Sequence, residues 1–356
     1  MTDKPTSGLS GKLEQMASAL SAAKRVLIIP HDYPDPDALA ASSAIHVLLA
    51  ERFGIHSQIV FSGQVSRAEN KELLRRMRCR WHLLEEVRAP RRVVPCIVID
   101  TAPWSRNVTI PPFAKPAMII DHHQHAVKHD LKGVFADIRA GAGATTTIAY
   151  EYLKEAGIAV PRWLAAIMAY AISSETLDLS RDSEKADLDA YVELAARADL
   201  KIIGKIRHAP LPRAYFRHLQ EAITAARKLG NLAWSHLSGT EQPEIIAEVA
   251  DLLLRMEGIR WSFCTADLKG DLFVSLRSNQ RGARCSHLLR AVIGRGGSAG
   301  GHHRMAAGYV HMGKCTPVEQ ENRRREFVRD LTVKIVKRQI KDINSIAILT
   351  QKLVEK

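Results

Sequence analysis

The sequence predicts an α/β protein with an N-terminal parallel-sheet domain and a smaller C-terminal mixed α/β domain. Two observations lead to this prediction. Short apolar, β-branched runs alternate with segments of helical periodicity, which is the pattern of βαβ units. The runs also lack the polar alternation of a half-exposed strand, so they suit a parallel sheet that is covered on both faces. The length of 356 residues fits about two domains.

The first half of the chain supplies the parallel sheet. The predicted strands lie at 26–29, 55–61, 93–99 and 117–120. The predicted helices lie at 13–24, 37–52, 144–156 and 161–173. Strands and helices in this order favour a sheet whose strands all end at the same edge.

The second half reads differently. We expect a helix-rich stretch over 187–237, interrupted by the prolines of HAPLPR (208–213). A strand pair with a Lys-Gly-Asp turn within 259–279, a helix at 285–292, a glycine-rich loop, a strand at 308–313 and a basic helix at 318–340 complete the chain. The resulting division is a first domain at 1–195, a helical linker at 196–235, a second domain at 236–335 and a tail at 336–356.

Composition restricts the partners and the compartment. Lysine and arginine exceed aspartate and glutamate by 51 − 38 = 13, and this balance favours a polyanionic partner such as nucleic acid or a nucleotide. The five scattered cysteines form no CxxC pair, which argues against a zinc ribbon and a disulfide framework. Neither a signal peptide nor a membrane span is evident, so we expect a cytoplasmic protein that does not enter a membrane.

An unusual acidic loop follows the first predicted strand, in IIPHDYPDPDALAASS (28–43). Its prolines exclude a helix interior. The spacing lets His31, Asp35 and Asp37 face one pocket beyond the carboxyl end of the strand, where open α/β sheets bind ligands. The alternative is that Asp37 only caps the next helix, with Asp32 and Asp35 as turn residues.

Two more predicted strands end in ionisable residues. VVPCIVIDTAP ends its strand at Asp100, and AMIIDHHQH ends another at Asp121, His122 and His123. Carboxylates 4 Å apart repel by about 4 kcal/mol at an effective dielectric of about 20. A multivalent cation is therefore the simplest explanation for so many acids at one edge.

The donor types restrict the metal and the reaction. Oxygen and imidazole ligands without thiolate suit Mn²⁺, Mg²⁺ or Fe²⁺ better than a structural zinc. Two such ions bridged by one carboxylate would clamp a phosphate and activate water, which is the chemistry of phosphoester hydrolysis.

These segments resemble the motifs of the DHH phosphoesterase family, which is named for the triplet found here at Asp121, His122 and His123. HDYPDPDALAASS resembles the first motif, IDTAP the second and IIDHHQ the third. ADIRAGAGATTTIAYEYL is similar to the segment that follows the third motif. The resemblance covers roughly residues 20–315.

Carried over to this sequence, the resemblance implies two divalent cations, with Mn²⁺ as the first choice. It implies that His31 and Asp35 hold one ion, that Asp37 and His122 hold the other, and that Asp100 bridges both. His123 would contact the scissile phosphate or act as an acid. Asp121 would orient the imidazoles through hydrogen bonds.

The fourth motif departs from the family pattern. AISSETLDLSRD offers Glu175-Thr176 where the family has an Asp-Thr pair. We favour Glu175 as a metal ligand, and Asp178 or a weakened second metal site are the alternatives.

The C-terminal segment GGSAGGHHRMAAG (296–308) resembles the glycine-histidine signature of the substrate-binding domain associated with the family. Gly300 and Gly301 would let backbone amides approach phosphate. His302 is the preferred adjacent histidine, and His303 is the alternative. Arg277 and Ser278 match an Arg-Ser pair near the substrate phosphate. The competing interpretation is a flexible loop and a surface arginine.

The resemblance implies a short soluble phosphoesterase related to RecJ. The expected substrates are oligonucleotides a few residues long, with 3′-phosphoadenosine 5′-phosphate as a second candidate. Other outcomes are a cyclic-dinucleotide or single-strand DNA phosphodiesterase, or a non-catalytic nucleic-acid-binding protein. A homodimer is also left open.

Some residues have less specific interpretations. Arg75, Arg76, Arg78 and Arg80 form a solvated helix face or, less often, a nucleic-acid track. Trp104 stacks a base or packs in the core. His125 is expected at the surface.

Overall fold

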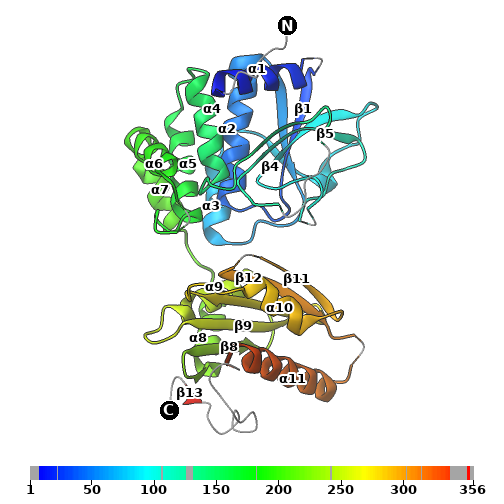
Figure 1. Cartoon of the computed structure of the whole chain (residues 1–356), viewed down its shortest axis with the longest axis vertical. Coiled ribbons are helices and arrows are strands. Elements are labelled where there is room, and N and C mark those ends of the chain that lie inside the picture. The colour runs from blue at the N-terminus through cyan, green and yellow to red at the C-terminus, as the bar shows by residue number, and fades with distance from the viewer. Residues whose placement is uncertain are drawn as a thin grey trace. The chain divides into compact units, whose positions relative to one another are not determined.

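The computed structural model describes residues 8–21, 23–105, 107–125, 131–181, 183–240, 243–301, 303–313, 315–336 and 351–352. It divides into two compact units, Met1–Pro210 and Leu211–Lys356 (Figure 1). Across the described ranges, no helix is both long enough and apolar enough to cross a membrane.

The first unit is built on a six-stranded sheet in the order β3-β2-β1-β4-β5-β6, and its described pairings are parallel. Its strands are β1 (Arg25–Pro30), β2 (His56–Phe61), β3 (Trp81–Leu83), β4 (Val94–Ile99), β5 (Ala114–Asp121) and β6 (Phe135–Ile138). The predicted α/β class with a parallel sheet is confirmed. The short edge strands β3 and β6 were not indicated by the sequence.

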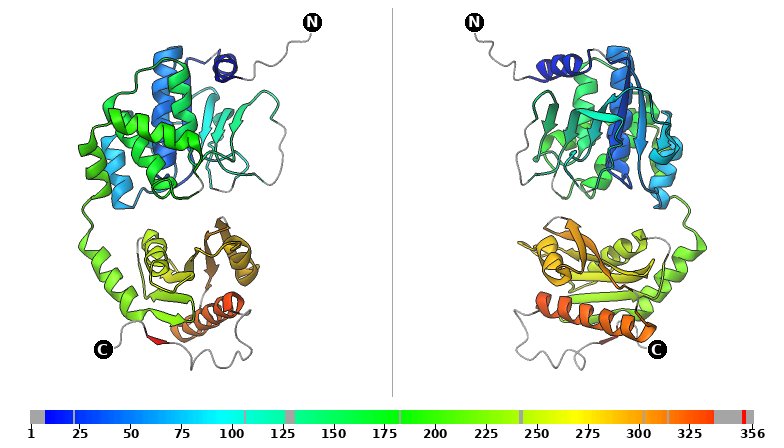
Figure 2. Two further views of the ribbon diagram at one scale, coloured as in Figure 1. Left: turned by 60° about the vertical axis from the view of Figure 1, so that its left-hand side comes forward. Right: turned by 90° about the vertical axis from the view of Figure 1, so that its right-hand side faces the viewer.

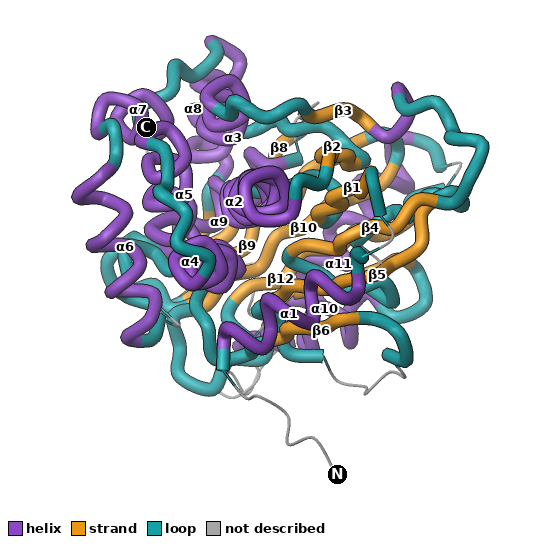
Figure 3. Tube along the Cα trace, turned by 90° about the horizontal axis from the view of Figure 1, so that it is seen from above, coloured by secondary structure: helices purple, strands orange, loops and turns teal. Residues whose placement is uncertain are grey.

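Helices cover one face of this sheet. They are α1 (Leu9–Ala19), α2 (Pro36–Phe53), α3 (Ala68–Arg76), α4 (Thr145–Glu155), α5 (Arg162–Glu175), α6 (Lys185–Arg197) and α7 (Leu200–Arg207). The buried helix α2 lies between the sheet and its neighbours α4 and α5 (Figure 3). Helix α1 begins at Leu9, four residues earlier than the predicted start at residue 13.

The opposite face of the sheet is covered without a long helix. Apolar side chains from the connections at 84–87, 104–113 and 131–134 pack there against β1, β4 and β5, and the short 3₁₀ helix η1 (Leu84–Glu86) is the regular element among them. Both faces are thus buried, as the continuous apolar runs indicate.

The second unit contains a seven-stranded mixed sheet in the order β11-β12-β10-β9-β8-β7-β13. Its strands are β7 (Arg227–Leu229), β8 (Leu232–Leu237), β9 (Trp261–Leu268), β10 (Asp271–Ser278), β11 (Gly297–Gly301), β12 (Met305–His311) and β13 (Gln351–Lys352). Its helices are α8 (Arg213–Ala225), α9 (Glu244–Leu254), α10 (Cys285–Ile293) and α11 (Pro317–Val336). Helices α8 and α9 contribute to one apolar cluster and α10 and α11 to another; α11 is the orange-red helix of Figure 2.

Two predictions for this half are wrong. The helix-rich stretch predicted to residue 237 ends at Ala225, because β8 pairs with β7 and β9 and is buried in the middle of the sheet. The predicted glycine-rich loop is strand β11, which pairs with β12. Strand pairing has overridden local propensity in both places, with the neighbouring strand β12 for β11 and with β7 and the more distant β9 for β8.

The predicted linker at 196–235 includes parts of both units. Helix α7 packs on α3 and α5 of the first unit, whereas α8 packs on β8 and α9 of the second. The HAPLPR segment spans the division at Pro210. The predicted tail begins at the end of α11, and most of it lies outside the described residues.

Close packing of β11 on β12 explains one of the glycines. A Cβ atom at Gly301 would lie 2.4 Å from the Met305 carbonyl oxygen, and the φ of Gly301 is +126°. At Gly300 a Cβ atom would meet nothing within 4 Å. A side chain therefore fits at position 300 but not at position 301.

We predict that Gly301→Ala lowers the free energy of unfolding by about 1–3 kcal/mol or more, because alanine is strained at this φ and collides with the backbone. Gly300→Ala should be neutral or slightly stabilising, since it reduces the flexibility of the unfolded chain. Thermal and denaturant unfolding of both variants checks this. Equal destabilisation by both substitutions would contradict the assigned packing.

Candidate metal centre

Strand register brings the predicted acidic loops to one edge. Pro30 of β1 pairs with Ile99 of β4, and Ile99 pairs with Ile120 of β5. The next residue of each chain segment is ionisable: these are His31, Asp100 and Asp121. Three adjacent parallel strands thus deliver these side chains to the same level of the sheet.

Asp100 is at the centre of the group and is only 2% exposed. Its Oδ2 lies 3.6 Å from His31 Nε2, whereas its Oδ1 lies 3.5 Å from His122 Nε2. Each oxygen of one carboxylate therefore faces a different histidine. The Asp100 backbone has a φ of +60°, a conformation that non-glycine residues adopt mainly where the surroundings enforce it.

Two sets of donor atoms meet at Asp100. His31, Asp35 and Asp100 form one set, and Asp100, His122 and His123 form the other, each with ligand atoms within 4.8 Å of one another. Within the first set, His31 Nε2 lies 3.7 Å from Asp35 Oδ2. The structure thus brings together most of the residues that the sequence predicted as metal ligands.

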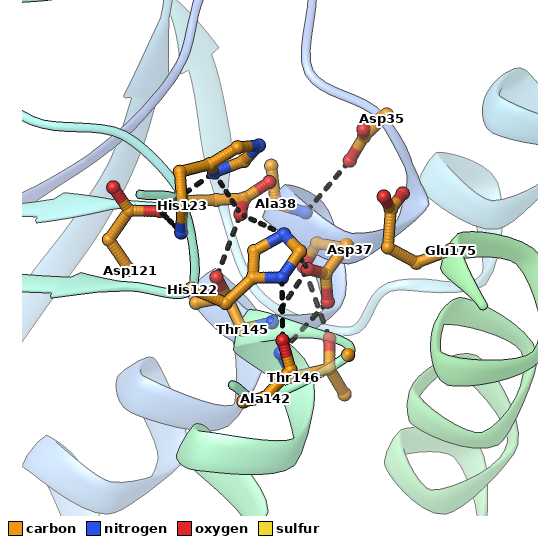
Figure 4. Close-up of polar contacts among 12 residues, drawn as sticks. Asp35, Asp37, Ala38, Asp121, His122, His123, Ala142, Thr145, Thr146 and Glu175 are labelled. Atoms are coloured by element: carbon orange, nitrogen blue, oxygen red, sulfur yellow. Dashed lines mark hydrogen bonds and ion pairs between the residues drawn. The ribbon is translucent and has the colours of Figure 1, made fainter. Parts of the chain in front are cut away.

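Asp37 joins the second set from the first turn of α2. Its Oδ2 lies 3.9 Å from His122 Nε2. The Asp37 carboxylate accepts hydrogen bonds from the backbone N–H groups of Thr145 (2.7 Å) and Thr146 (2.8 Å), where α4 begins (Figure 4). Thr145 Oγ1 also donates to Asp100 Oδ1 at 2.7 Å.

Sequence reasoning missed these threonines, although the small residues of GAGATTT before α4 were a signal that its first amides are accessible. The capping alternative is also corrected. Asp35 is the N-cap of α2 and accepts from Ala38 N–H at 3.0 Å, whereas Asp37 lies inside the helix. Asp32 accepts from the Thr109 N–H and hydroxyl instead.

Asp121 holds two imidazoles. Its Oδ1 accepts from His123 Nδ1 at 2.8 Å and from the His123 N–H at 3.1 Å. Its Oδ2 accepts from His125 Nε2 at 2.7 Å. The expectation of a surface His125 is therefore wrong: the side chain is half-buried and meets the Trp104 ring edge to face, with centroids 5.4 Å apart. Trp104 itself packs on the loop-covered face of the sheet.

Glu175 reaches the site from the last residue of α5, and Figure 4 shows its carboxylate on the side of Asp35 and Asp37. Asp178 points elsewhere: its side chain is 75% exposed and bonds Arg207 Nη2 at 3.2 Å and the Ser173 hydroxyl at 2.5 Å. These contacts favour Glu175 over Asp178 as the carboxylate that completes the site.

Residues 25–172 match the model of the DHH family, N-terminal domain. The first unit therefore carries a DHH-family N-terminal domain. The matched residues include every aspartate and histidine of the centre described above, and Glu175 follows three residues after their end.

Two curated relatives are similar over part of their length. An uncharacterised protein of Methanocaldococcus jannaschii is 28% identical over 306 residues, which are 86% of this chain and 62% of that protein. A probable manganese-dependent inorganic pyrophosphatase of Streptococcus agalactiae is 24% identical over 179 residues, which are 50% of this chain and 57% of that protein. The chain spans about three fifths of the length of these relatives.

Solved structures share the fold. An exopolyphosphatase-related protein from Bacteroides fragilis superposes with a TM-score of 0.68 at 13% identity, covering 93% of this chain and 98% of that one. RecJ from Thermus thermophilus, solved in complex with Mn²⁺, has a TM-score of 0.53 at 14% identity and covers 95% of this chain and 56% of that one. These similarities establish the architecture of the protein.

The residues of the DHH centre fit a divalent cation. His122 Nδ1 bonds the Ala142 carbonyl at 3.0 Å, and His31 Nδ1 bonds the Asp32 carbonyl at 2.9 Å. A carbonyl accepts only, so each Nδ1 carries a proton, and when the ring is neutral its Nε2 lone pair points at carboxylates. His122 Nε2 is buried without a hydrogen-bond partner. A cation would satisfy that atom, and the oxygen and nitrogen donors suit Mn²⁺, Mg²⁺ or Fe²⁺.

The pKa shifts of the metal-free site have the same origin. Burial and the neighbouring charges of Asp37 and Asp35 raise the pKa of Asp100 well above its usual range. Burial by itself would lower the pKa of His31, but Asp35 and Asp100 raise it to about 10. Without a metal, bound protons therefore neutralise the buried carboxylates in place of a cation.

The predicted substrate contacts lie in the second unit. Arg277 is paired with Asp251, with Nε 2.6 Å from Oδ1, and the Ser278 hydroxyl donates to the Arg260 carbonyl at 3.0 Å. Gly300 and Gly301 belong to β11, and His303 is exposed. His302 lies outside the described residues.

A pH dependence follows from Glu175. Burial, together with Asp35 and Asp37, raises its pKa from 4.5 to about 7. The folded state thus binds this proton more tightly than the unfolded state does, so the stabilisation is complete below pH 4.5 and is lost as the pH rises through 7.

We predict that the melting temperature of the metal-free protein falls across this interval and that Glu175→Gln, which stays neutral, makes the fall shallower. Asp178→Asn, in the turn that follows α5, should leave it unchanged. Thermal unfolding in chelator at several pH values measures both. A Glu175→Gln variant with the wild-type slope would place Glu175 outside the charge cluster.

Proposed function

We propose that this protein is a metal-dependent phosphoesterase that hydrolyses phosphodiester bonds in short oligonucleotides. The observation that supports the proposal most strongly is the geometry of Asp100, whose two oxygens face separate groups of histidine and carboxylate donors. A carboxylate in that position can bridge two cations. Phosphoester hydrolysis is the reaction that a bridged pair of divalent ions serves best.

The proposed ligands are divided as follows. His31, Asp35 and Asp100 would hold one ion, and Asp100, Asp37, His122 and Glu175 would hold the other. The chemistry that such ions supply is activation of water and neutralisation of phosphate charge. Mn²⁺ is the first candidate because the donors are oxygen and imidazole, and the similar Streptococcus agalactiae pyrophosphatase is described as manganese-dependent.

His123 has a different proposed role. Burial lowers the pKa of its imidazole, but the hydrogen bond and charge of Asp121 outweigh burial and raise it. The ring is therefore held in one orientation, and its protonated form, which a general acid requires, is favoured. We assign His123 to the scissile phosphate, where it would protonate the leaving oxygen, and Asp121 to positioning it.

Several features support a nucleotide substrate. The formal net charge of +13 favours phosphate-rich ligands. The second unit adds Ser278, Gly300, Gly301 and the 302–303 histidines as proposed phosphate contacts, together with Arg277 if its pair with Asp251 opens on binding. The substrate 3′-phosphoadenosine 5′-phosphate offers the same chemistry on a smaller molecule. Scattered, mostly buried cysteines agree with a reducing cytoplasm.

The test is a panel of substrates with Mn²⁺: di- to pentaribonucleotides, the matching deoxynucleotides, cyclic dinucleotides, 3′-phosphoadenosine 5′-phosphate and pyrophosphate. We expect the short ribonucleotides to be cleaved fastest. Asp100→Asn should lower kcat/KM by about 10³-fold or more, because the bridging charge is lost. Asp32→Asn is the matched control in the first acidic loop, since its carboxylate bonds Thr109 outside the cluster, and it should retain most of the activity.

Different outcomes discriminate between the functions. Cleavage of pyrophosphate alone would replace the oligonucleotide assignment with a pyrophosphatase. Turnover restricted to cyclic dinucleotides or longer single-stranded DNA would change the substrate class and leave the metal chemistry intact. No turnover of any substrate, together with salt-sensitive oligonucleotide binding, would indicate a non-catalytic nucleic-acid-binding protein.

A further inference from the structure

Basic side chains gather in the first unit at the end of the sheet opposite to the metal centre. Arg25 begins β1 and pairs in register with His56, which begins β2. Arg80 immediately precedes β3. The other five residues of β1 separate Arg25 from His31, a distance of about 20 Å at the rise of a strand. This region is therefore distinct from the proposed catalytic site.

The outer edge of β2 is open near these residues. Strand β3 pairs only with Ile59–Phe61, so within the described chain the segment 56–58 has no strand beside it on that edge. A cavity of about 410 Å³ lies there, lined by Arg25, Arg78 and Arg80 among others. Its volume is within the range of ordinary ligand sites.

A second cavity of about 500 Å³ lies where α5 and α7 begin. Arg78 lines this cavity as well as the first, and Arg162, Lys201 and Trp163 contribute to it. The one carboxylate in its described lining is Asp199, which caps α7 by accepting from the Lys201 N–H at 3.0 Å. Arg78 thus connects two basic hollows.

The arginine run at 75–80 is divided by the fold. Arg75 and Arg76 lie on α3 and pair with Glu72, as a solvated helix face predicts. Arg78 and Arg80 lie beyond the end of α3, and both are exposed. These two, like Arg162 and Lys201, make no ion pair within the part of the chain that the structure describes.

We propose that the two cavities form an accessory binding site for single-stranded oligonucleotide. Arg78, Arg80, Arg162 and Lys201 would contact successive phosphates, and a base would stack on Trp163. The cations are spread along two hollows on either side of Arg78, which suits a chain of phosphates better than one compact anion. The assignment goes beyond the proposed hydrolysis, because a dinucleotide bound at the metal centre could not reach this accessory binding site.

The site is tested by fluorescence anisotropy with the full chain in chelator, using a labelled single-stranded RNA of about 12 nucleotides, within the range of single-strand site sizes. Arg78→Glu with Arg80→Glu should raise Kd by about tenfold or more. The slope of log K against log salt should fall by about 1.4, which is roughly 0.7 for each lost phosphate contact.

The matched control is Arg213→Glu with Arg217→Glu, the same change of charge at two exposed residues of α8. It should bind the RNA as the wild type does. Equal weakening of RNA binding by both double variants would mean that net charge alone drives binding. Wild-type RNA binding by the Arg78/Arg80 variant would show that the RNA does not bind at the two cavities. Either result overturns the proposal.

Two further measurements separate this site from others. Trp163→Leu should weaken RNA binding but not binding of inorganic polyphosphate; if both ligands bind the variant as they bind the wild type, the oligonucleotide assignment is wrong. With Mn²⁺, the Arg78/Arg80 variant should cleave dinucleotides at the wild-type rate. The Asp100→Asn variant should bind the 12-nucleotide RNA as the wild type does. Loss of hydrolysis and loss of binding at the accessory site are therefore distinguishable.

Discussion

The metal centre depends on how two histidines are held. His31 and His122 each direct Nδ1 at a backbone carbonyl, which fixes the ring and leaves Nε2 facing buried carboxylates. A neutral ring in this orientation presents a lone pair to negative oxygens. The arrangement is unfavourable unless a positive charge lies between the nitrogen and the oxygens. These backbone contacts therefore favour binding of a cation or a proton at the site.

The rest of the first unit fixes the positions of these histidines and carboxylates. Parallel pairing of β1, β4 and β5 sets the level at which His31, Asp100 and Asp121 leave the sheet. Amides at the start of α4 hold Asp37, and Asp100 is kept in a left-handed backbone conformation that costs of order 1–3 kcal/mol. Packing of α2 against α4 and α5 supplies the rigidity that tolerates both costs.

Much of the first unit could be predicted from the sequence, because its strands are continuous apolar runs and its acids follow them directly. The contacts that orient those acids could not. Thr145 and Thr146 are more than a hundred residues from Asp37, and only the folded chain brings their amides to its carboxylate. The burial of His125 also depends on its contact with the Trp104 ring, which local spacing does not reveal.

The second unit was predicted less well for a related reason. Its strands β7, β8 and β11 are short or glycine-rich, and pairing with β8, β9 and β12, not local propensity, holds them as strands. Local propensity is a poor guide where pairing across the sheet decides the structure.

The central claim is that Asp100 bridges two divalent cations whose other ligands include the Nε2 atoms of His31 and His122. Anomalous diffraction at the manganese edge, from crystals grown with Mn²⁺, tests this most directly. The account predicts two peaks, one beside each oxygen of Asp100, with an imidazole Nε2 at each. A single peak away from Asp100, or none near it, would contradict the account.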